Sequence, residues 1–366
     1  MAPNGWSTAA GRAGDPQGGC RVKVLVTGVA GRVGSTLAQQ LVAAGYEVRG
    51  TVRPDGRQPH PALARRIEVV EAPLSDAAAV RRAVAGVDVV VHLAARMVVG
   101  DVPPEELLDV NVGGTLRLLE AAVTGRRRVR RFVLASTDGT YGPARPRFSP
   151  ITEEHPQHPG DYYGMTKVLA EQLVRNHREL HGLEYTIMRL GSVVAPNEVL
   201  PLFRLGWARA FVAGQVAAGR RGSLWQVFDG RDDAVAALDQ MVAARVDNAA
   251  AVLIGPDGAP WAVHLTDVRD AVAGLMLGIE HPKAADDHFN IVGPSTTTFA
   301  AGARVVAARF DLETVTVALP MRLAFEISPA KARDVLGYEP RWDFAATLET
   351  ALRAPHVDPT YLPVGG

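Results

Sequence analysis

The residues most suggestive of chemistry are a tyrosine and a lysine four positions apart, Tyr163 and Lys167, in the segment Y-G-M-T-K. Residues at positions i and i+4 of a helix lie on one face, so these side chains are expected to be neighbours. A nearby ammonium lowers the pKa of a tyrosine, which makes the phenol usable as a general base near neutral pH. Lysine occurs at only four positions of this arginine-rich chain, so an ordinary surface pair is the weaker interpretation.

A second candidate is the segment S-T-D-G-T-Y-G at 136–142, which directly follows the apolar run 132–135. Its hydroxyls and its carboxylate stand where a strand is expected to end, which suits either a turn or a catalytic loop. The segment precedes the tyrosine–lysine pair along the chain, and we therefore favour the catalytic interpretation. Thr137 is the predicted working hydroxyl, and Asp138 is a candidate substrate contact whose task the sequence leaves open.

The segment T-G-V-A-G-R-V-G, residues 27–34, follows an apolar strand expected at 22–26 and opens a helix expected at 32–44. The first glycine permits a tight turn, the second lets the backbone approach a pyrophosphate at the helix N-terminus, and the third lets helix and strand pack closely. We therefore predict a dinucleotide site here, formed by Gly28, Gly31, Arg32, Val33 and Gly34.

The end of the second expected strand carries information on the cofactor. NAD-binding sites usually place an acid there for the adenosine ribose hydroxyls. In this chain the place holds Val52, followed by Arg53. A missing acid beside an arginine suits a 2′-phosphate, to which Arg32 would add a second positive charge. We predict NADP as the preferred cofactor, with NAD as the alternative if both arginines are merely solvated.

These candidate residues can act together only if the fold brings the ends of several strands close to one another, and the sequence predicts such a fold. Apolar strands alternate with helices from residue 22 to 190, including one helix over 104–125 and another over 161–181. Continuous apolar strands alternating with helices indicate a parallel sheet covered on both faces. We predict a Rossmann-type doubly wound α/β domain over 21–190 and a smaller α/β substrate-binding region over 191–355, interleaved with it.

Composition narrows the class of protein. The 366 residues include 47% hydrophobic and 21% charged residues, which is typical of a globular protein. Basic and acidic residues both number 39, so nothing points to nucleic acid or an anionic membrane as partner. The single cysteine, Cys20, fits a reducing cytoplasm. Residues 1–20 and 356–366 are expected to be loose tails.

Taken together, these segments resemble the extended short-chain dehydrogenases/reductases, the NAD-dependent epimerase/dehydratase family. The likeness runs over about 21–350 and includes the order and spacing of six motifs. It implies Thr137 as the catalytic hydroxyl, Tyr163 as the acid/base and Lys167 as the lysine on the nicotinamide ribose. Asn111 matches the family's structural or proton-relay asparagine. The six motifs are T-G-V-A-G-R-V-G at 27–34, H-L-A-A at 92–95, N-V-G-G-T at 111–115, S-T-D-G-T-Y-G at 136–142, Y-G-M-T-K at 163–167 and R-L-G at 189–191.

The resemblance also extends the cofactor site. It places Leu93, Ala94 and Ala95 at a strand end beside the cofactor, with His92 expected to be a satisfied core histidine. The family's aspartate on the adenine amino group is replaced here by Pro73, although Leu74 is still expected to pack on the ring.

The residue at position 139 distinguishes between the reactions that the resemblance allows. Family members that are 4,6-dehydratases carry Thr-Asp-Glu, and the glutamate is the base that drives elimination. This chain has Gly139 in that place, so a dehydratase is disfavoured. We predict an NAD(P)-dependent oxidoreductase that transfers a hydride between nicotinamide and a secondary alcohol or ketone, with a sugar epimerase as the alternative. A non-catalytic nucleotide-binding regulator is a third, weaker interpretation, because it would not need the catalytic residues.

The substrate is a small molecule of unknown identity. The Arg-Asp run that binds the diphosphate in sugar-nucleotide enzymes is replaced by Pro260 and Trp261, which weakens a nucleotide-sugar interpretation. Candidate substrate contacts are Arg96, Asp138 and Trp261, and no metal is predicted. The resemblance also implies a homodimer formed through helices at about 105–123 and 161–180.

Overall fold

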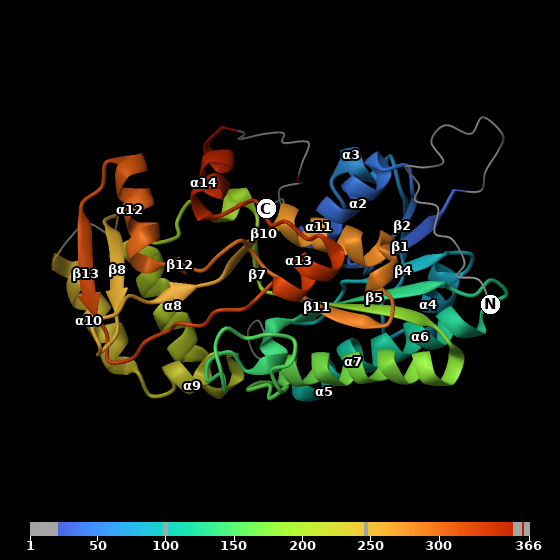
Figure 1. Ribbon diagram of the computed structural model, residues 1–366, viewed down its shortest axis with the longest axis horizontal. Coiled ribbons are helices and arrows are strands. Elements are labelled where there is room, and N and C mark those ends of the chain that lie inside the picture. The colour runs from blue at the N-terminus through green and yellow to red at the C-terminus, as the bar shows by residue number, and fades with distance from the viewer. Residues whose placement is uncertain (1–20, 98–101, 245–247, 354–360, 362–366) are drawn as a thin grey trace.

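The structure is a computed structural model that describes residues 21–97, 102–244, 248–353 and 361. The predicted tails at 1–20 and 356–366 lie outside the described residues, except for Tyr361, which is buried. A layered part is built on a seven-stranded sheet, and a second, smaller part lies at one end of it (Figure 1).

The central sheet confirms the predicted Rossmann-type doubly wound fold. Its strand order is β11-β6-β5-β4-β1-β2-β3, and all of its pairings are parallel. The order reverses between β1 and β4, and ligands of such sheets bind at the carboxyl ends of the strands at this switch point. The strands are β1 (Lys23–Thr27), β2 (Glu47–Val52), β3 (Glu68–Glu71), β4 (Val89–His92), β5 (Arg131–Thr137), β6 (Glu184–Leu190) and β11 (Asp287–Ile291).

Helices cover both faces of the sheet, which explains why its central strands are continuous apolar runs. Two separate apolar clusters fill the two layers between sheet and helices. One layer is closed by α2 (Arg32–Ala43), α11 (Val268–Glu280) and α13 (Ala330–Leu336), and the other by α4 (Ala77–Val84), α6 (Gly114–Thr124) and α7 (Tyr162–His181) (Figure 1). Short helices α3 (Pro61–Ala64), η2 (Asp138–Tyr141) and η5 (Pro282–Ala284) lie in the connections between these elements.

The single helix predicted over 104–125 is divided in the structure. It consists of α5 (Pro104–Leu107), a π-helical turn η1 (Leu108–Gly113) and α6. Single π turns inside helices are rare and are frequently found at functional sites. The wider turn holds Asn111, whose contacts are described below.

The second part packs around its own apolar core of aromatic side chains. Phe203, Phe228 and Phe299 are fully buried there, and Trp261 makes edge contacts with the last two. Strand β11 and helices α11 and α13 return from this half of the chain to the central sheet, and the boundary near residue 190 stays a prediction. Its elements are β7 (Ser192–Val194), η3 (Pro196–Glu198), α8 (Leu205–Ala218), η4 (Gly219–Arg221), α9 (Trp225–Phe228), α10 (Asp232–Ala244), β8 (Ala250–Ile254), β9 (Ala262–Val263), β10 (Leu265–Asp267), β12 (Thr297–Thr298), α12 (Phe299–Phe310), β13 (Thr314–Ala318) and α14 (Phe344–Arg353).

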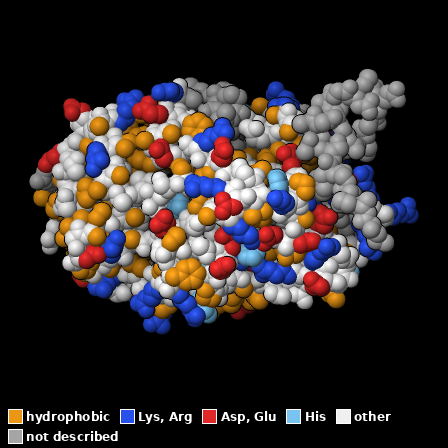
Figure 2. Space-filling view, viewed as in Figure 1, with side chains coloured by type: hydrophobic (Ala, Val, Ile, Leu, Met, Phe, Trp, Pro, Cys, Tyr) orange, Lys and Arg blue, Asp and Glu red, His pale blue; other side chains and the backbone are white. Residues whose placement is uncertain are grey.

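The surface is of mixed charge. Lysine and arginine side chains lie among aspartates and glutamates on the face seen in Figure 2, in keeping with a net charge of zero. Among the described helices, none combines the length and the apolar content that crossing a bilayer requires.

Candidate active site

The glycine turn between β1 and α2 has the shape that a dinucleotide phosphate requires. Gly28 has a φ of +70°, a conformation that L side chains rarely adopt. A Cβ on Gly34 would lie 2.3 Å from the carbonyl oxygen of Gly28, so only glycine allows this approach. No side chain caps α2 at Gly31, and its first turn holds no acidic residue. The N–H groups and the dipole at this helix start are therefore available to an anion, and the residues fit a pyrophosphate.

A buried hydrogen-bond chain fixes the neighbouring strand end. The Thr27 hydroxyl accepts from the backbone N–H groups of Leu93 and Ala94, at 3.1 and 3.0 Å, and lies 2.8 Å from Nδ1 of His92. Thr115 donates its hydroxyl hydrogen to the carbonyl of Asn111, so Nε2 of His92 must donate to Thr115 and Nδ1 must accept from Thr27. Burial, together with the charge of Lys167, lowers the pKa of His92 to about 3. His92 is thus a neutral core residue that positions the strand end.

Asn111 connects this strand end to the helix that carries the tyrosine. Its Oδ1 accepts from the backbone N–H of Arg96 at 2.7 Å, and its Nδ2 donates to the Arg96 carbonyl and to the Thr166 hydroxyl, both at 3.0 Å. Thr166 in turn donates to the carbonyl of Tyr163. The side chain of Arg96 forms an ion pair with Glu106 at 3.0 Å. Asn111 therefore acts in this structure as a buried brace between the loop after β4 and α7.

Thr137 ends β5 and begins η2. Its hydroxyl donates to Oδ1 of Asp138 at 3.0 Å and accepts from the N–H of Gly139 at 3.1 Å. Burial raises the pKa of the Asp138 carboxyl to about 6, although the bonds from Thr137 and Gly139 oppose the shift. Asp138 can therefore hold or release a proton close to neutral pH, beside the predicted catalytic hydroxyl.

Tyr163 and Lys167 lie in the first turns of α7, which packs directly on η2. Asp161 caps this helix by accepting from the N–H of Gly164 at 2.6 Å. A Cβ on Gly164 would lie 2.7 Å from the carbonyl oxygen of Gly139, which shows how closely α7 approaches η2. The structure thus brings the tyrosine, the lysine and the hydroxyl segment to one place at the carboxyl edge of the sheet.

The electrostatics of Tyr163 differ from the expectation that Lys167 lowers its pKa. Burial and then the charges of Asp138 and Asp161 raise the pKa of Tyr163 well above its ordinary value. Burial also lowers the pKa of the Lys167 ammonium to about 8. The phenol is therefore protonated in this state of the protein. The lowering expected from Lys167 together with an oxidised nicotinamide stays a prediction, because burial and the two carboxylates act in the opposite direction in the protein without cofactor.

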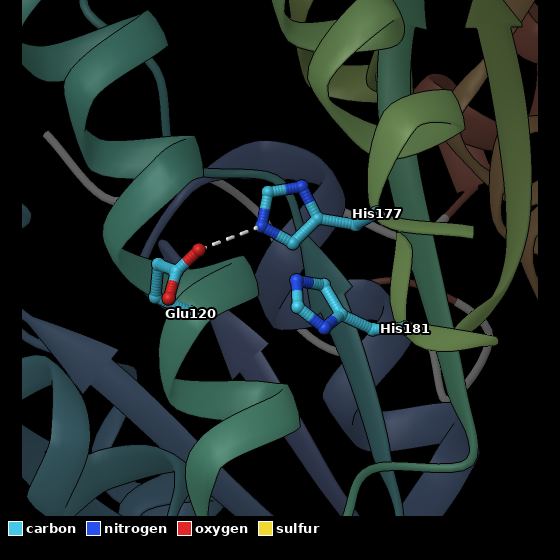
Figure 3. A group of neighbouring side chains, drawn as sticks. All are labelled: Glu120, His177 and His181. Atoms are coloured by element: carbon cyan, nitrogen blue, oxygen red, sulfur yellow. Dashed lines mark hydrogen bonds and ion pairs between the residues drawn. The ribbon is translucent and has the colours of Figure 1, made fainter. Parts of the chain in front are cut away.

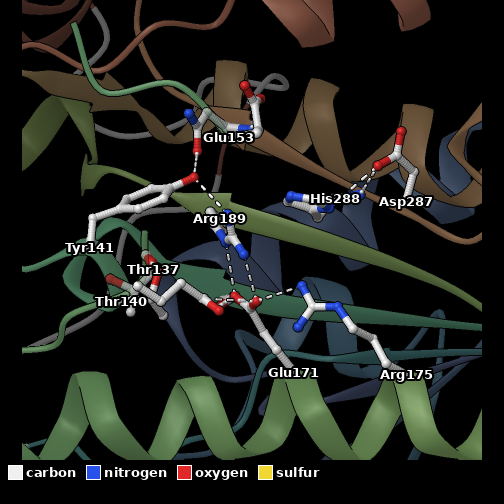
Figure 4. Close-up of polar contacts among 12 residues, drawn as sticks. Thr137, Thr140, Tyr141, Glu153, Glu171, Arg175, Arg189, Asp287 and His288 are labelled. Carbon is white, nitrogen blue, oxygen red and sulfur yellow. Dashed lines mark hydrogen bonds and ion pairs between the residues drawn. The ribbon is translucent and has the colours of Figure 1, made fainter. Parts of the chain in front are cut away.

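A buried polar network behind the site escaped the sequence analysis (Figure 4). The carboxylate of Glu171 accepts from Arg189 at 3.0 and 2.7 Å and from Ser136 at 2.6 Å. Burial raises the pKa of Glu171, but the hydrogen bonds and charge of Arg189 outweigh it and hold the pKa at about 2. Arg189 also donates to the phenol of Tyr141 at 2.7 Å. The available signal was spacing, since Glu171 follows Tyr163 at two successive intervals of four.

The two arginines predicted for a 2′-phosphate have different surroundings. Nε and one terminal nitrogen of Arg32 each lie 2.5 Å from a carboxylate oxygen of Glu198. This pair connects the glycine turn to η3 of the second part. Arg53 is exposed at the end of β2, directly after the buried Val52. Of these two arginines, only Arg53 therefore has a charge that faces solvent and is not paired with an acid among the described residues. Val33 and Ala95 are partly buried beside the turn and after β4.

Leu74 and Trp261 lie in packed surroundings. A Cβ on Gly114 would lie 2.8 Å from the Cβ of Leu74, so the leucine packs directly against the start of α6. Trp261 is fully buried in the second core, and its indole N–H donates to the carbonyl of Met321 at 3.0 Å. The assignment of Trp261 as a substrate contact stays a prediction.

The fold, the switch point and the uncapped glycine turn define a dinucleotide-binding protein of the Rossmann class. The chain belongs to the NAD dependent epimerase/dehydratase family, whose sequence profile matches residues 24–292. It is similar to a short-chain dehydrogenase/reductase superfamily protein from Agrobacterium tumefaciens solved with bound NAD, at 33% identity. That comparison covers 91% of this chain and 97% of the other, with a TM-score of 0.77.

Curated relatives match a shorter stretch. The chain is 36% identical over 210 residues to a UDP-glucose 4-epimerase of Streptomyces lividans, covering 55% of this chain and 62% of the relative. It is 31% identical over 170 residues to a uronate dehydrogenase of Pseudomonas syringae pv. tomato, covering 46% and 59%. The chain therefore spans about three fifths of the length of these relatives.

Proposed function

We propose that the protein is an NAD(P)-dependent dehydrogenase/reductase that interconverts a secondary alcohol and the corresponding ketone. The observation that carries this proposal is the meeting of Thr137, Tyr163 and Lys167 at the sheet edge next to the glycine turn. A dinucleotide bound at the glycine turn would supply the hydride acceptor or donor. The chain itself supplies the proton transfer and the orientation of the substrate oxygen.

The state of Asp138 sets which way the Thr137 hydroxyl points. While Asp138 is ionised, Thr137 donates to it and is left to accept a hydrogen bond from a substrate alcohol. Once Asp138 is protonated, near pH 6, its own hydrogen becomes available and the Thr137 hydrogen can turn to a ketone oxygen. Tyr163, protonated in this state, is suited to donate a proton to that oxygen, and Lys167 keeps a positive charge beneath it below about pH 8.

A screen of secondary alcohols and ketones with both cofactors tests the activity, with Tyr163→Phe as the catalytic probe. We expect the variant to lose about 10²- to 10⁴-fold in turnover, because the acid/base is removed. Its affinity for the dinucleotide is expected to stay unchanged in a fluorescence titration. Turnover of the variant at the wild-type rate would remove Tyr163 from the reaction.

We further propose that NADP is preferred over NAD. Supporting this are the apolar Val52 where an acid would hold the ribose and the exposed charge of Arg53 beside it. Arg32 no longer contributes to this argument, because it is bound to Glu198. Arg53→Ala should weaken NADP binding by about tenfold, the loss of one exposed charge-assisted contact, and leave NAD nearly unchanged. An equal effect on both dinucleotides would contradict the assignment.

A sugar epimerase is the second candidate, favoured by the named epimerase relative and by the Arg32–Glu198 pair. This pair ties the cofactor turn to the second part, which suits a cofactor retained between oxidation and re-reduction. The protein should then carry stoichiometric dinucleotide through purification and need none added. Purified protein that releases no dinucleotide on denaturation would reject the epimerase. A dehydratase remains disfavoured because Gly139 offers no base.

The partner we propose, besides a small-molecule substrate, is a second copy of the chain, with no role for nucleic acid or membrane. Five large apolar side chains are exposed on or beside α6 and α7. Leu116→Glu and Leu169→Glu together should convert a dimer to a monomer in sedimentation velocity, and an unchanged mass would place any interface elsewhere. The five are Leu108, Leu116, Tyr162, Leu169 and Leu180.

A further inference from the structure

Two histidines and a glutamate converge at the far end of α7 from the predicted active site (Figure 3). His177 and His181 lie at i and i+4 on α7, and Glu120 faces them from α6. One potential ligand atom from each residue lies within 4.8 Å of the other two. His177 lies fourteen positions after Tyr163, which is about 21 Å along a helix, so the group is distinct from the active site.

The hydrogen bonds of His177 direct its Nε2 toward the carboxylate of Glu120. Its Nδ1 lies 2.9 Å from the carbonyl oxygen of Leu173, which can only accept, so Nδ1 carries the hydrogen. Its Nε2 lies 3.1 Å from a carboxylate oxygen of Glu120, which also only accepts. Nε2 therefore either carries a second proton or directs its lone pair at a negative charge. In the second case, a positive ion between the two atoms is required.

The arrangement around His177 matches that of metal-bound histidines. Such ligands donate their other ring nitrogen to a backbone carbonyl, which fixes the tautomer and the orientation of the ring. The His177 side chain is only 5% exposed, whereas Glu120 and His181 are exposed. One ligand is thus held rigidly while the site stays open to solvent, which would supply the remaining ligands as water.

We propose that Glu120, His177 and His181 bind one divalent first-row transition-metal ion, with Zn²⁺ as the reference. Two imidazoles and one carboxylate suit such an ion, at about 2.0–2.2 Å from each ligand atom. The exposed side chains of Glu120 and His181 would have to adjust to reach that distance. The ion joins the C-terminal ends of α6 and α7 and so holds together two helices of one layer of the sheet.

The test uses the untagged full chain, freed of metal with a chelator and titrated with Zn²⁺ by calorimetry. His181→Ala and Glu120→Gln each remove one ligand at an exposed position, so the fold is expected to be kept. Glu179→Gln is the matched control, because it removes an equal charge from an exposed position on the same helix. Circular dichroism checks that all three variants keep the wild-type fold.

We expect one ion per chain in the wild type and in Glu179→Gln. Affinity should fall by about tenfold or more in each of the two ligand variants. Co²⁺ in place of Zn²⁺ should give visible absorption bands in the wild type that are altered in His181→Ala. Absence of saturable binding would overturn the proposal. Equal loss of affinity in the control would do the same.

Discussion

Replacing Asp138 with asparagine is expected to move the pH dependence of alcohol oxidation to lower pH. Oxidation requires Tyr163 to accept a proton, and the pKa of this phenol is raised by burial and by the negative charge of Asp138. The amide oxygen of asparagine can still accept the hydrogen bond from Thr137, which the carboxylate accepts at 3.0 Å. The substitution therefore removes the charge while it keeps the local geometry.

The size of the shift follows from Coulomb's law. For a unit charge at a representative separation of about 5 Å and an effective dielectric constant of about 20, the interaction is about 3 kcal/mol, which corresponds to about two pKa units. Asp138 is partly exposed, so we expect about one to two units. The sign is downward, because a neutral neighbour no longer opposes the phenolate.

The assay is the pH profile of kcat/KM for alcohol oxidation, whose acid limb reports the base of the free enzyme. Asp161→Asn keeps a good helix cap and should shift the limb in the same direction by less, because its charge contributes less to Tyr163. Glu179→Gln, exposed near the other end of the helix, should shift nothing. An acid limb that stays in place or rises in Asp138→Asn would refute the electrostatic reasoning.

Two further predictions concern stability and the cofactor turn. Glu171→Leu leaves the buried charge of Arg189 without its carboxylate and should cost about 3–5 kcal/mol in urea unfolding, whereas Arg175→Ala, which removes a partly exposed partner, should cost about 1 kcal/mol or less. Gly34→Ala forces a Cβ against a backbone carbonyl, so dinucleotide affinity should fall at least about tenfold with a loss of about 1–3 kcal/mol in stability. Gly214→Ala, which meets nothing within 4 Å in a helix, should instead be neutral or slightly stabilising. Equal results for either matched pair would contradict these explanations.

The frame of the protein could be predicted from the sequence because local patterns determine it. The apolar strands β1, β4 and β5 alternate with helices, and α7 runs from Tyr162 to His181, nearly as expected over 161–181. The glycine turn could likewise be predicted, since its spacing reflects contacts within a few residues of Gly28.

The parts that could not be predicted depend on contacts between distant segments. The sequence indicates no partner for the charge of Arg32, yet its guanidinium forms an ion pair with Glu198, which lies 166 positions later. The pKa of Tyr163 depends on its burial and on the charge of Asp138, which reaches the ring from η2, a segment 25 positions earlier in the chain. No feature of the sequence around Trp261 distinguishes an aromatic residue of the core from one that lines a pocket.

The π turn at Leu108–Gly113 has a consequence for how this chain tolerates insertions and deletions. Each residue of an α-helix advances the direction of its side chains by about 100°. Losing one residue from this turn would restore α-helical winding and rotate Asn111 relative to α6. Asn111 could then keep its contacts with Arg96 and Thr166 only if α6 moved, and if α6 stayed in place Asn111 would turn toward solvent. The residue count of this turn is thus as much a requirement of the brace as the identity of the asparagine.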